Sequence, residues 1–173
     1  CDVICHVVRL FSDDNIIKAG SVDPKSDFET VKIELDLADL EMEAKHKEKK
    51  RKNDEEVELP LFSKKLILIV LNVDEKELVC AHDLEKKWAG ELGVKEDQVI
   101  VVCAKTEAEL ADLSEEDQLG YLRELGVAKG GLERLIKKAF ATLGLMTFLT
   151  AGEKEVRAWT IKKECTALQA AGV

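Results

Sequence analysis

Several features that define other classes of protein are absent from this sequence. No run of residues approaches the roughly 18 consecutive apolar positions of a membrane-spanning helix, and the first residues lack the basic, apolar and small-residue order of a signal peptide. The five cysteines form no CxxC pair and lie mostly in apolar runs, which argues against a disulfide framework and against a zinc site. We therefore expect a cytoplasmic protein with no membrane partner, no metal site and reduced, buried thiols.

The residues that bind nucleotide phosphates are absent as well. A nucleoside triphosphatase holds the phosphates with backbone amides and a lysine, for which GxxxxGK[ST] is the usual motif. The nearest spacing, residues 126–131, is followed by leucine and glutamate, so it offers neither the lysine nor the hydroxyl group that binds magnesium. Residues 117–120 fit a bare DxxG pattern, but they fall in a predicted helix. No residue can be assigned to catalysis or to Mg²⁺ binding.

The sequence has no excess of positive charge. Its formal net charge is -9, which argues against general nucleic-acid binding, and we expect no DNA partner. Its hydrophobic content of 46% is that of an ordinary globular protein. The first residue is cysteine rather than methionine and the chain enters an apolar run at once, so we expect an internal stretch of a longer protein.

Three short apolar runs, rich in β-branched residues, predict strands buried on both faces: residues 3–10, 66–71 and 99–103. Between the last two, apolar residues recur at i, i+4 and i+8 from Leu84 to Leu92, which predicts a helix with one apolar stripe. Strand, helix and strand in this order predict a parallel βαβ unit. The expected fold class is therefore α/β.

Residues 28–44 carry apolar side chains at helical spacing on two sides, and their continuation, residues 45–52 (KHKEKKRK), is almost wholly charged. Later in the chain, Ser114 and Asp117 fit a capping box at the start of a helix.

The clearest helical periodicity covers residues 132–143, which are closed by Gly144. Beyond that glycine, residues 146–150 and 155–162 indicate a β-rich element.

Polar residues follow the second predicted strand, as Asn72-Val73-Asp74-Glu75. They lie at the carboxyl edge of a parallel sheet, where ligands bind. Asparagine offers a donor and an acceptor to a base, and an acid two or three residues later can accept from an exocyclic amine. The same residues fit a simple strand-to-helix turn with an Asx motif, and the spacing alone favours that turn.

The third predicted strand ends at the same edge, as Cys103-Ala104-Lys105. Ala104 would let its backbone approach a base closely. Lys105 could cover the ring or could equally be a solvated residue at a helix start. Together the two strand ends could frame one pocket.

Once these two strand ends are considered together, the chain resembles the YchF (Obg-like) ATPase family over nearly its whole length. The members of this family are P-loop NTPases of the TRAFAC class. Residues 72–75 look like the family's NxxE version of the NKxD base-reading motif, and residues 103–110 resemble the segment that closes the base pocket. The stretches that carry the resemblance are residues 1–9 (CDVICHVVR), 14–16 (DNI), 22–24 (VDP), 34–40 (ELDLADL), 72–75 (NVDE), 103–110 (CAKTEAEL), 150–152 (TAG), 155–161 (EVRAWTI) and 169–172 (QAAG).

The resemblance implies the C-terminal half of a P-loop NTPase, with a Rossmann-like parallel sheet, a shortened helical arm and the start of a β-rich TGS domain. Residues 1–40 would be an NTPase strand and helix, and residues 41–60 a truncated helical or coiled-coil insertion. Residues 61–144 would be the base-recognition half of the NTPase domain, and residues 145–173 the start of the TGS domain. Glu164 and Leu168 stand where the family usually has glycine and proline.

The resemblance also implies a ribosome-associated protein that hydrolyses ATP, often also GTP, with Mg²⁺ ligands that lie outside this chain. Glu75 replaces the aspartate that selects guanine and moves the acceptor by about one bond length, which loosens the selection. Val73 replaces the motif's lysine, so its contact with the ring would be apolar. We expect the chain to be inactive alone, with a base pocket formed by Asn72, Val73, Glu75, Cys103, Ala104 and Lys105.

The basic run has two interpretations. Clustered cations are sufficient to neutralise RNA phosphates, so the run could contact ribosomal RNA. The second interpretation, a solvated root of a trimmed helical arm, is favoured. An alternative function follows from the first: a non-catalytic module that binds a ribosome or a protein through the basic arm and the TGS edge. The cations are Lys45, Lys47, Lys49, Lys50, Arg51 and Lys52.

Overall fold

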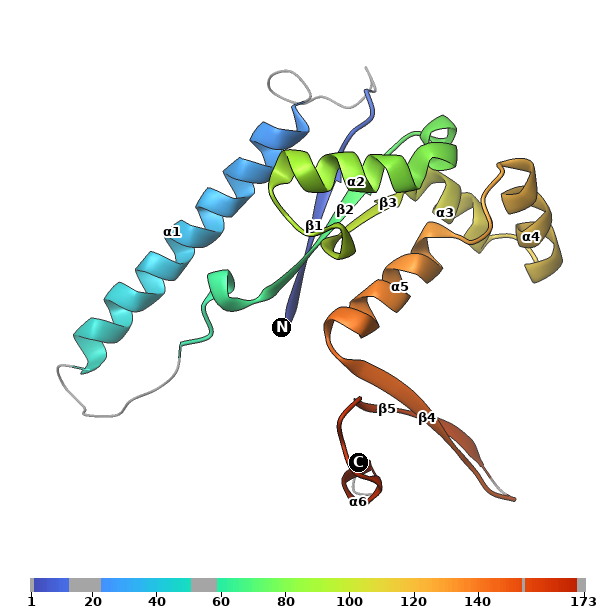
Figure 1. Cartoon of the computed structure of the whole chain (residues 1–173). Helices are drawn as coiled ribbons and strands as arrows, with labels where there is room; N and C mark the ends of the chain where they lie inside the picture. The colour runs from blue at the N-terminus through green and yellow to red at the C-terminus, as the bar shows by residue number, and fades with distance from the viewer. Residues whose placement is uncertain (1, 13–22, 51–58, 154, 171–173) are drawn as a thin grey trace.

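Figure 1 shows a computed structural model of the chain, which describes residues 2–12, 23–50, 59–153 and 155–170. Three strands, β1 (Val3–Arg9), β2 (Leu66–Asn72) and β3 (Val99–Val102), form a parallel sheet in the order β1-β2-β3. Each strand ends within one residue of its predicted run. The predicted α/β class and parallel sheet are confirmed.

Six α-helices lie in the described residues: α1 (Pro24–Lys50), α2 (Ala81–Leu92), α3 (Ala104–Ala111), α4 (Glu115–Glu124), α5 (Gly131–Thr142) and α6 (Ala167–Ala170). Three short 3-10 helices, η1 (Phe62–Lys64), η2 (Glu75–Cys80) and η3 (Glu96–Gln98), connect to the strands. None of these described helices is long and apolar enough to cross a membrane.

The helix boundaries follow local chemistry. Asp23 caps α1, because its carboxylate accepts from the amides of Lys25 and Ser26 at 3.1 and 3.2 Å. Ser114 caps α4 by accepting from the amide of Asp117 at 3.3 Å, as predicted. The return bond of the predicted capping box differs, since the Asp117 carboxylate accepts from the Ser114 hydroxyl at 2.6 Å.

The main core lies between one face of the sheet and helix α2, with Phe28 of α1 at its side. Alternate strand residues, among them Val8, Ile69 and Leu71, point to this face because successive side chains of a strand alternate between faces. Leu84, Trp88 and Leu92 of α2 pack against it, so the predicted apolar stripe is confirmed. On the opposite face, Leu135 of α5 packs against a smaller cluster, Val70, Ile100 and Val102.

Strand β1 is not buried on both faces as predicted. Val8 is buried, but Val7 is 60% exposed and Cys5 is also exposed. The physical reason is the position of β1 in the sheet. It is the outer strand at one edge, whereas α5 packs against β3, the strand at the opposite edge. An apolar run identifies a strand, but it does not show which neighbours cover that strand.

The prediction of buried thiols is correct only in part. Cys5, Cys80, Cys103 and Cys165 are all free, and Cys1 lies outside the described residues. Cys103 is buried, whereas Cys5 and Cys80 are exposed.

The outer edge of β3 is sealed by side chains. Glu85 of α2 is buried, and its carboxylate accepts from the amide of Val101 at 3.0 Å. Arg134 of α5 pairs with the same carboxylate, and Lys138 donates to the carbonyl of Val99. The backbone amide of Val101 and the carbonyl of Val99, which could otherwise pair with another strand, are therefore hydrogen-bonded within the chain.

Helix α1 is tied to the chain that returns to the sheet. The carboxylate of Asp39, which is buried, accepts from the amides of Phe62 and Ser63 at 2.6 and 2.7 Å. Burial by itself raises the pKa of Asp39, but these bonds outweigh it and the net pKa is lowered. The helix is continuous from Pro24 to Lys50, so the predicted start of the insertion at residue 41 falls inside it.

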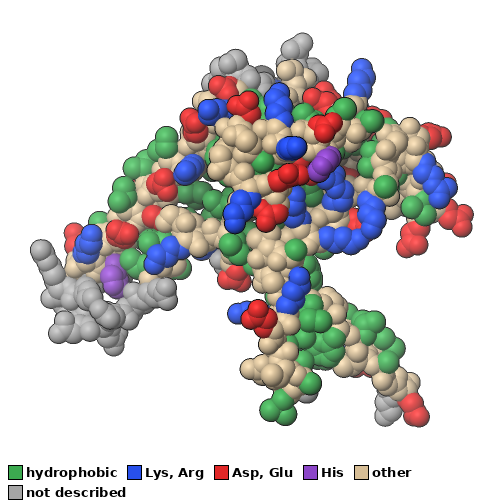
Figure 2. Space-filling view, in the orientation of Figure 1, with side chains coloured by type: hydrophobic (Ala, Val, Ile, Leu, Met, Phe, Trp, Pro, Cys, Tyr) green, Lys and Arg blue, Asp and Glu red, His purple; other side chains and the backbone are tan. Residues whose placement is uncertain are grey.

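The predicted β-rich element is an antiparallel hairpin of β4 (Leu145–Ala151) and β5 (Val156–Lys162). Trp159 donates to the Thr150 hydroxyl at 2.9 Å, and the Arg157 guanidinium lies 4.2 Å from the Trp159 ring centroid. Figure 2 shows hydrophobic side chains on the surface of this hairpin, where Leu149 and Val156 are exposed.

Candidate functional site: the carboxyl edge of the sheet

The three strands end level with one another at the carboxyl edge of the sheet. Arg9 of β1 is in register with Asn72 of β2, which is in register with Val102 of β3. The amide of Leu10 donates to the carbonyl of Asn72 at 2.9 Å, and the amide of Val73 donates to that of Val102 at 3.0 Å. The two predicted polar segments therefore lie side by side.

A side-chain hydrogen bond joins these segments directly. Oδ1 of Asn72 accepts from the backbone amide of Ala104 at 3.0 Å. Ala104 is the first residue of α3, where backbone amides lack partners inside the helix, so Asn72 satisfies one of them. Because the oxygen is used in this way, the Nδ2 group of Asn72 is the part of its amide left to donate to a ligand.

Glu75 follows Asn72 by three residues and is the first residue of η2. The turn before it is fixed by Asp74, whose amide donates to the carboxylate of Glu77 at 3.1 Å in a capping box. Glu75 is not a member of that box, and its side chain is half-buried. Asp74 and Glu77 thus form the turn, and Glu75, the acid predicted to contact a base, does not take part in it.

Four of the predicted base-contacting residues differ in accessibility. Ala104 and Lys105 are exposed at the start of α3. The side chains of Val73 and Cys103 are 2% and 3% exposed and belong to the main core. Because both side chains lie in the core beneath the edge, the direct contact of the Val73 side chain with a base ring, which was predicted, does not fit this arrangement.

Two residues that the sequence analysis did not select lie close to this edge. The Tyr121 hydroxyl of α4 donates to the Glu109 carboxylate at 3.0 Å. That bond raises the pKa of Tyr121, with further contributions from burial and from the charges of Glu109, Glu75 and Cys103. Tyr121 is the single tyrosine of the chain, but nothing in its spacing indicates that α4 folds back beside Glu75.

Thr106, the third residue of α3, is 1% exposed, and its hydroxyl has no hydrogen-bond partner among the described residues. Within the same residues, no group of three His, Cys, Asp or Glu side chains is placed to hold a metal ion. The polar groups found at this edge are the Asn72 amide, the Glu75 carboxylate and the backbone amide of Ala104.

The basic run lies at the far end of α1 and is only partly described. Lys45 and Lys47 pair with Glu41 and Glu43 one helical turn earlier, at 3.4 and 4.0 Å. Such exposed pairs leave the cations in solvent and add little stability. Lys49 and Lys50 belong to α1, without described side chains, and Arg51 and Lys52 lie outside the described residues. Contact with ribosomal RNA stays a prediction.

Comparison with known proteins gives consistent results. The family model YchF-GTPase_C, described as "Protein of unknown function (DUF933)", matches residues 145–173. The chain is 40% identical over 213 aligned positions to "Ribosome-binding ATPase YchF" of Bacillus subtilis (strain 168), covering 99% of this chain and 58% of that protein. The protein of the same name from Escherichia coli O157:H7 is 36% identical over 209 positions, with the same coverage.

The fold is similar to a solved structure, that of the Schizosaccharomyces pombe YchF GTPase. The TM-score is 0.77 at 26% sequence identity, over 99% of this chain and 58% of that chain. The chain thus spans 58% of the length of the relatives it matches. Because the Bacillus subtilis alignment has 213 positions and this chain 173 residues, that relative holds additional residues inside the matched region.

Proposed function

This chain belongs to the YchF family, and on that premise we propose that it supplies the purine-base pocket of a ribosome-associated protein that binds and hydrolyses ATP. The observation that carries the proposal is the hydrogen bond from the amide of Ala104 to Oδ1 of Asn72. It holds the ends of two parallel strands together at the edge where α/β sheets bind ligands. Association with ribosomes is proposed from the names of the relatives.

The groups at this edge match adenine better than guanine. On the base edge that carries N7, adenine offers an N6 amine that donates and an N7 atom that accepts, whereas guanine offers two acceptors there, O6 and N7. The Nδ2 group of Asn72 would donate to N7, and the Glu75 carboxylate would accept from the N6 amine. Ala104 has no side chain beyond Cβ to block the ring, and the stem of Lys105 would cover one ring face.

Hydrolysis requires groups that these residues do not supply. The sequence contains no GxxxxGK[ST] segment, so we assign no phosphate contact, no Mg²⁺ ligand and no catalytic residue to it. ATP or GTP with Mg²⁺ would be the ligand of the longer protein. The role of this chain would be to position and select the base.

A nucleotide titration of two proteins tests the proposal. Fluorescent ATP and GTP analogues are titrated into this chain and into a longer version extended upstream through a GxxxxGK[ST] segment. We expect the longer protein to bind ATP and this chain to bind it weakly or not at all, because the phosphates contribute most of the charge-assisted contacts. Absence of binding in both proteins would contradict the proposal.

One substitution separates base selection from folding. Asn72→Asp keeps an oxygen that accepts from Ala104, but it replaces the Nδ2 donor with a second acceptor. In the longer protein we expect ATP affinity to fall by about tenfold, which is about 1.4 kcal/mol. Gln169→Glu, the same amide-to-acid change on α6, is the control; it keeps an oxygen that accepts from the Thr166 amide and should leave ATP affinity unchanged. Equal affinities for Asn72→Asp and the control would show that Asn72 does not read the base.

A further inference from the structure

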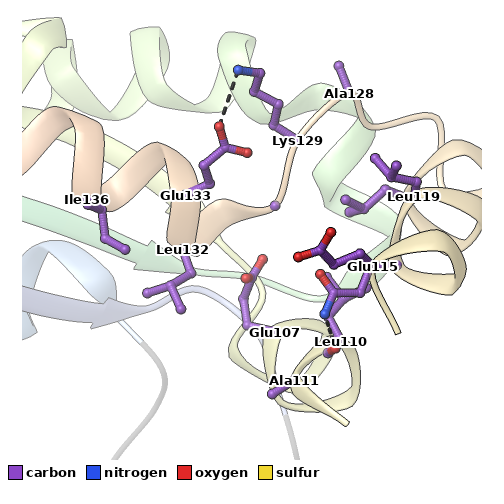
Figure 3. A pocket seen from close by; sticks show the side chains of 13 residues that line it. Glu107, Leu110, Ala111, Glu115, Leu119, Ala128, Lys129, Leu132, Glu133 and Ile136 are labelled. Atoms are coloured by element: carbon purple, nitrogen blue, oxygen red, sulfur yellow. Dashed lines mark hydrogen bonds and ion pairs between the residues drawn. The ribbon is translucent and has the colours of Figure 1, made fainter. Parts of the chain in front are cut away.

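A second surface feature lies between helices α3, α4 and α5. It is a groove of about 540 Å³, lined by residues from Glu107 to Ile136, and Figure 3 shows its side chains from close by. Its volume is within the range of about 300–1,000 Å³ that ligand pockets occupy. The nucleotide-base proposal makes no use of it.

The groove is apolar on both walls. Leu110 and Leu122 are buried at its base, whereas Leu119 of α4 and Leu132 and Ile136 of α5 are 53%, 52% and 51% exposed. Aliphatic side chains that are half exposed and gathered around one hollow are typical of a surface that binds a partner. Their burial would supply the hydrophobic part of the binding energy.

The rim of the groove is acidic. Three of the lining residues, Glu107, Glu115 and Glu133, are acidic, and one, Lys129, is basic. Figure 3 shows the carboxylates of Glu107 and Glu115 on the α3 and α4 side of the groove. Glu107 accepts from the amide of Gly131 at 2.6 Å, and for Glu115 no ion pair is found among the described residues. The cation at the rim, Lys129, is already paired with Glu133 at 3.3 Å.

We propose that this groove binds a basic, amphipathic helical segment of a partner protein. Apolar side chains of that segment enter between Leu119 and Leu132, and its lysine or arginine side chains meet Glu115 and Glu107. The excess of carboxylates over cations in the lining disfavours RNA, whose phosphates would be repelled. A second copy of this chain is tested below as an alternative occupant. The proposal does not depend on nucleotide binding.

A designed peptide serves as the probe. It carries leucine at helical spacing, three and four residues apart, and lysine elsewhere. Two comparison peptides replace all lysines by glutamate or all leucines by serine, and poly(U) RNA is the fourth ligand. Binding is measured by fluorescence anisotropy, and the binding site is located by hydrogen exchange of the protein.

Two pairs of variants test whether the peptide binds in the groove. Leu132→Asp changes its wall and Glu115→Lys reverses the charge of its rim. Leu149→Asp and Glu153→Lys make the same chemical changes on the β4–β5 hairpin, where both residues are exposed. We expect the leucine-lysine peptide to bind the native chain and to lose at least about tenfold in affinity in each groove variant, which is about 1.4 kcal/mol. The hairpin variants should retain native affinity.

The expected hydrogen-exchange result is protection of residues 107–136 by the leucine-lysine peptide alone. Circular dichroism establishes that each variant is folded, and Glu115→Lys changes an exposed side chain that no core contact requires. Equal binding of the leucine-glutamate peptide, competition by poly(U), or native affinity in both groove variants would overturn the proposal. Protection of the groove in the free chain at rising protein concentration would also overturn it, since a second copy would then be the occupant.

Discussion

At the scale of single residues, Gly131 shows how closely α5 approaches the sheet. A Cβ atom at this position would lie 3.1 Å from both the Glu107 carboxylate and the Val102 side chain. Val102 belongs to a strand and cannot easily withdraw. We therefore expect Gly131→Ala to lower the free energy of unfolding by about 1–3 kcal/mol, as overpacking in other cores does.

The control for this change is Gly120→Ala. Gly120 lies inside α4, and a Cβ atom there would meet nothing within 4 Å. Alanine stabilises a helix interior relative to glycine by about 0.5–1 kcal/mol, so this variant should gain stability. Urea denaturation of both variants gives the comparison, and a gain at both positions would show that α5 can move away from Val102.

In the proposed pocket, Glu75 is the residue that we expect to set the base preference. In the proposed pocket its carboxylate accepts from the N6 amine of adenine, while guanine selection in related motifs uses a shorter aspartate. We expect Glu75→Asp to shift the ratio of GTP to ATP affinity towards GTP by about tenfold in the longer protein, which is about 1.4 kcal/mol. Competition titrations with the two nucleotides measure this ratio. An unchanged ratio would remove Glu75 from the base-reading role.

At the scale of secondary-structure elements, the Asp39 carboxylate connects α1 to η1. Its folded-state pKa is lowered, so the stabilisation it provides is present above its unfolded pKa of about 3.9 and is lost as pH falls through the folded pKa. Asn in this position can accept one of the two amide bonds but not the second. We expect Asp39→Asn to unfold at lower urea concentration at pH 7, with the difference from the native chain shrinking in acid.

Asp36→Asn is the control for this prediction, because Asp36 is exposed on the same helix. Urea denaturation from pH 7 into the acid range gives both curves. A constant difference between Asp39→Asn and the native chain at all pH values would show that the charge of Asp39 does not stabilise the fold.

The elements of this fold could be predicted from local patterns, but several of its connections could not. The strand runs, the stripe of α2 and the end of α5 at Gly144 depend on residues near one another in the sequence. The contact of Asp39 with Phe62 crosses 23 residues, and that of Glu107 with Gly131 crosses 24. Such pairs depend on how helices return to the sheet, which periodicity does not describe.

The candidate site, too, could be predicted from the sequence only in part. The meeting of Asn72 with Ala104 could be predicted because parallel strands end at one edge. The burial of Val73 and the approach of Tyr121 could not, because the first depends on packing beneath the edge and the second on the fold of α4. Local sequence was enough to propose the polar groups of the candidate site, and tertiary packing decides which of them are accessible.

At the scale of the whole molecule, the two edges of the sheet are treated differently. The β3 edge is closed by the carboxylate of Glu85 and the ammonium of Lys138. On β1, the outer strand at the other side, Cys5 and Val7 are exposed. Exposed apolar residues on an outer strand are a common route to pairing between chains. The charge of -9 opposes association but is spread over the whole chain.

We therefore expect the 173-residue chain on its own to self-associate through β1. Analytical ultracentrifugation should show a mass that rises with concentration, and oxidation should crosslink exposed Cys5 between copies. Val7→Lys should favour the monomer, because a charge on the outer strand opposes pairing. Leu149→Lys, an equal change on the hairpin, should not. A monodisperse monomer with a sharp cooperative melt would contradict this prediction, since it would mean that an outer strand with Val7 exposed is stable in water without a partner.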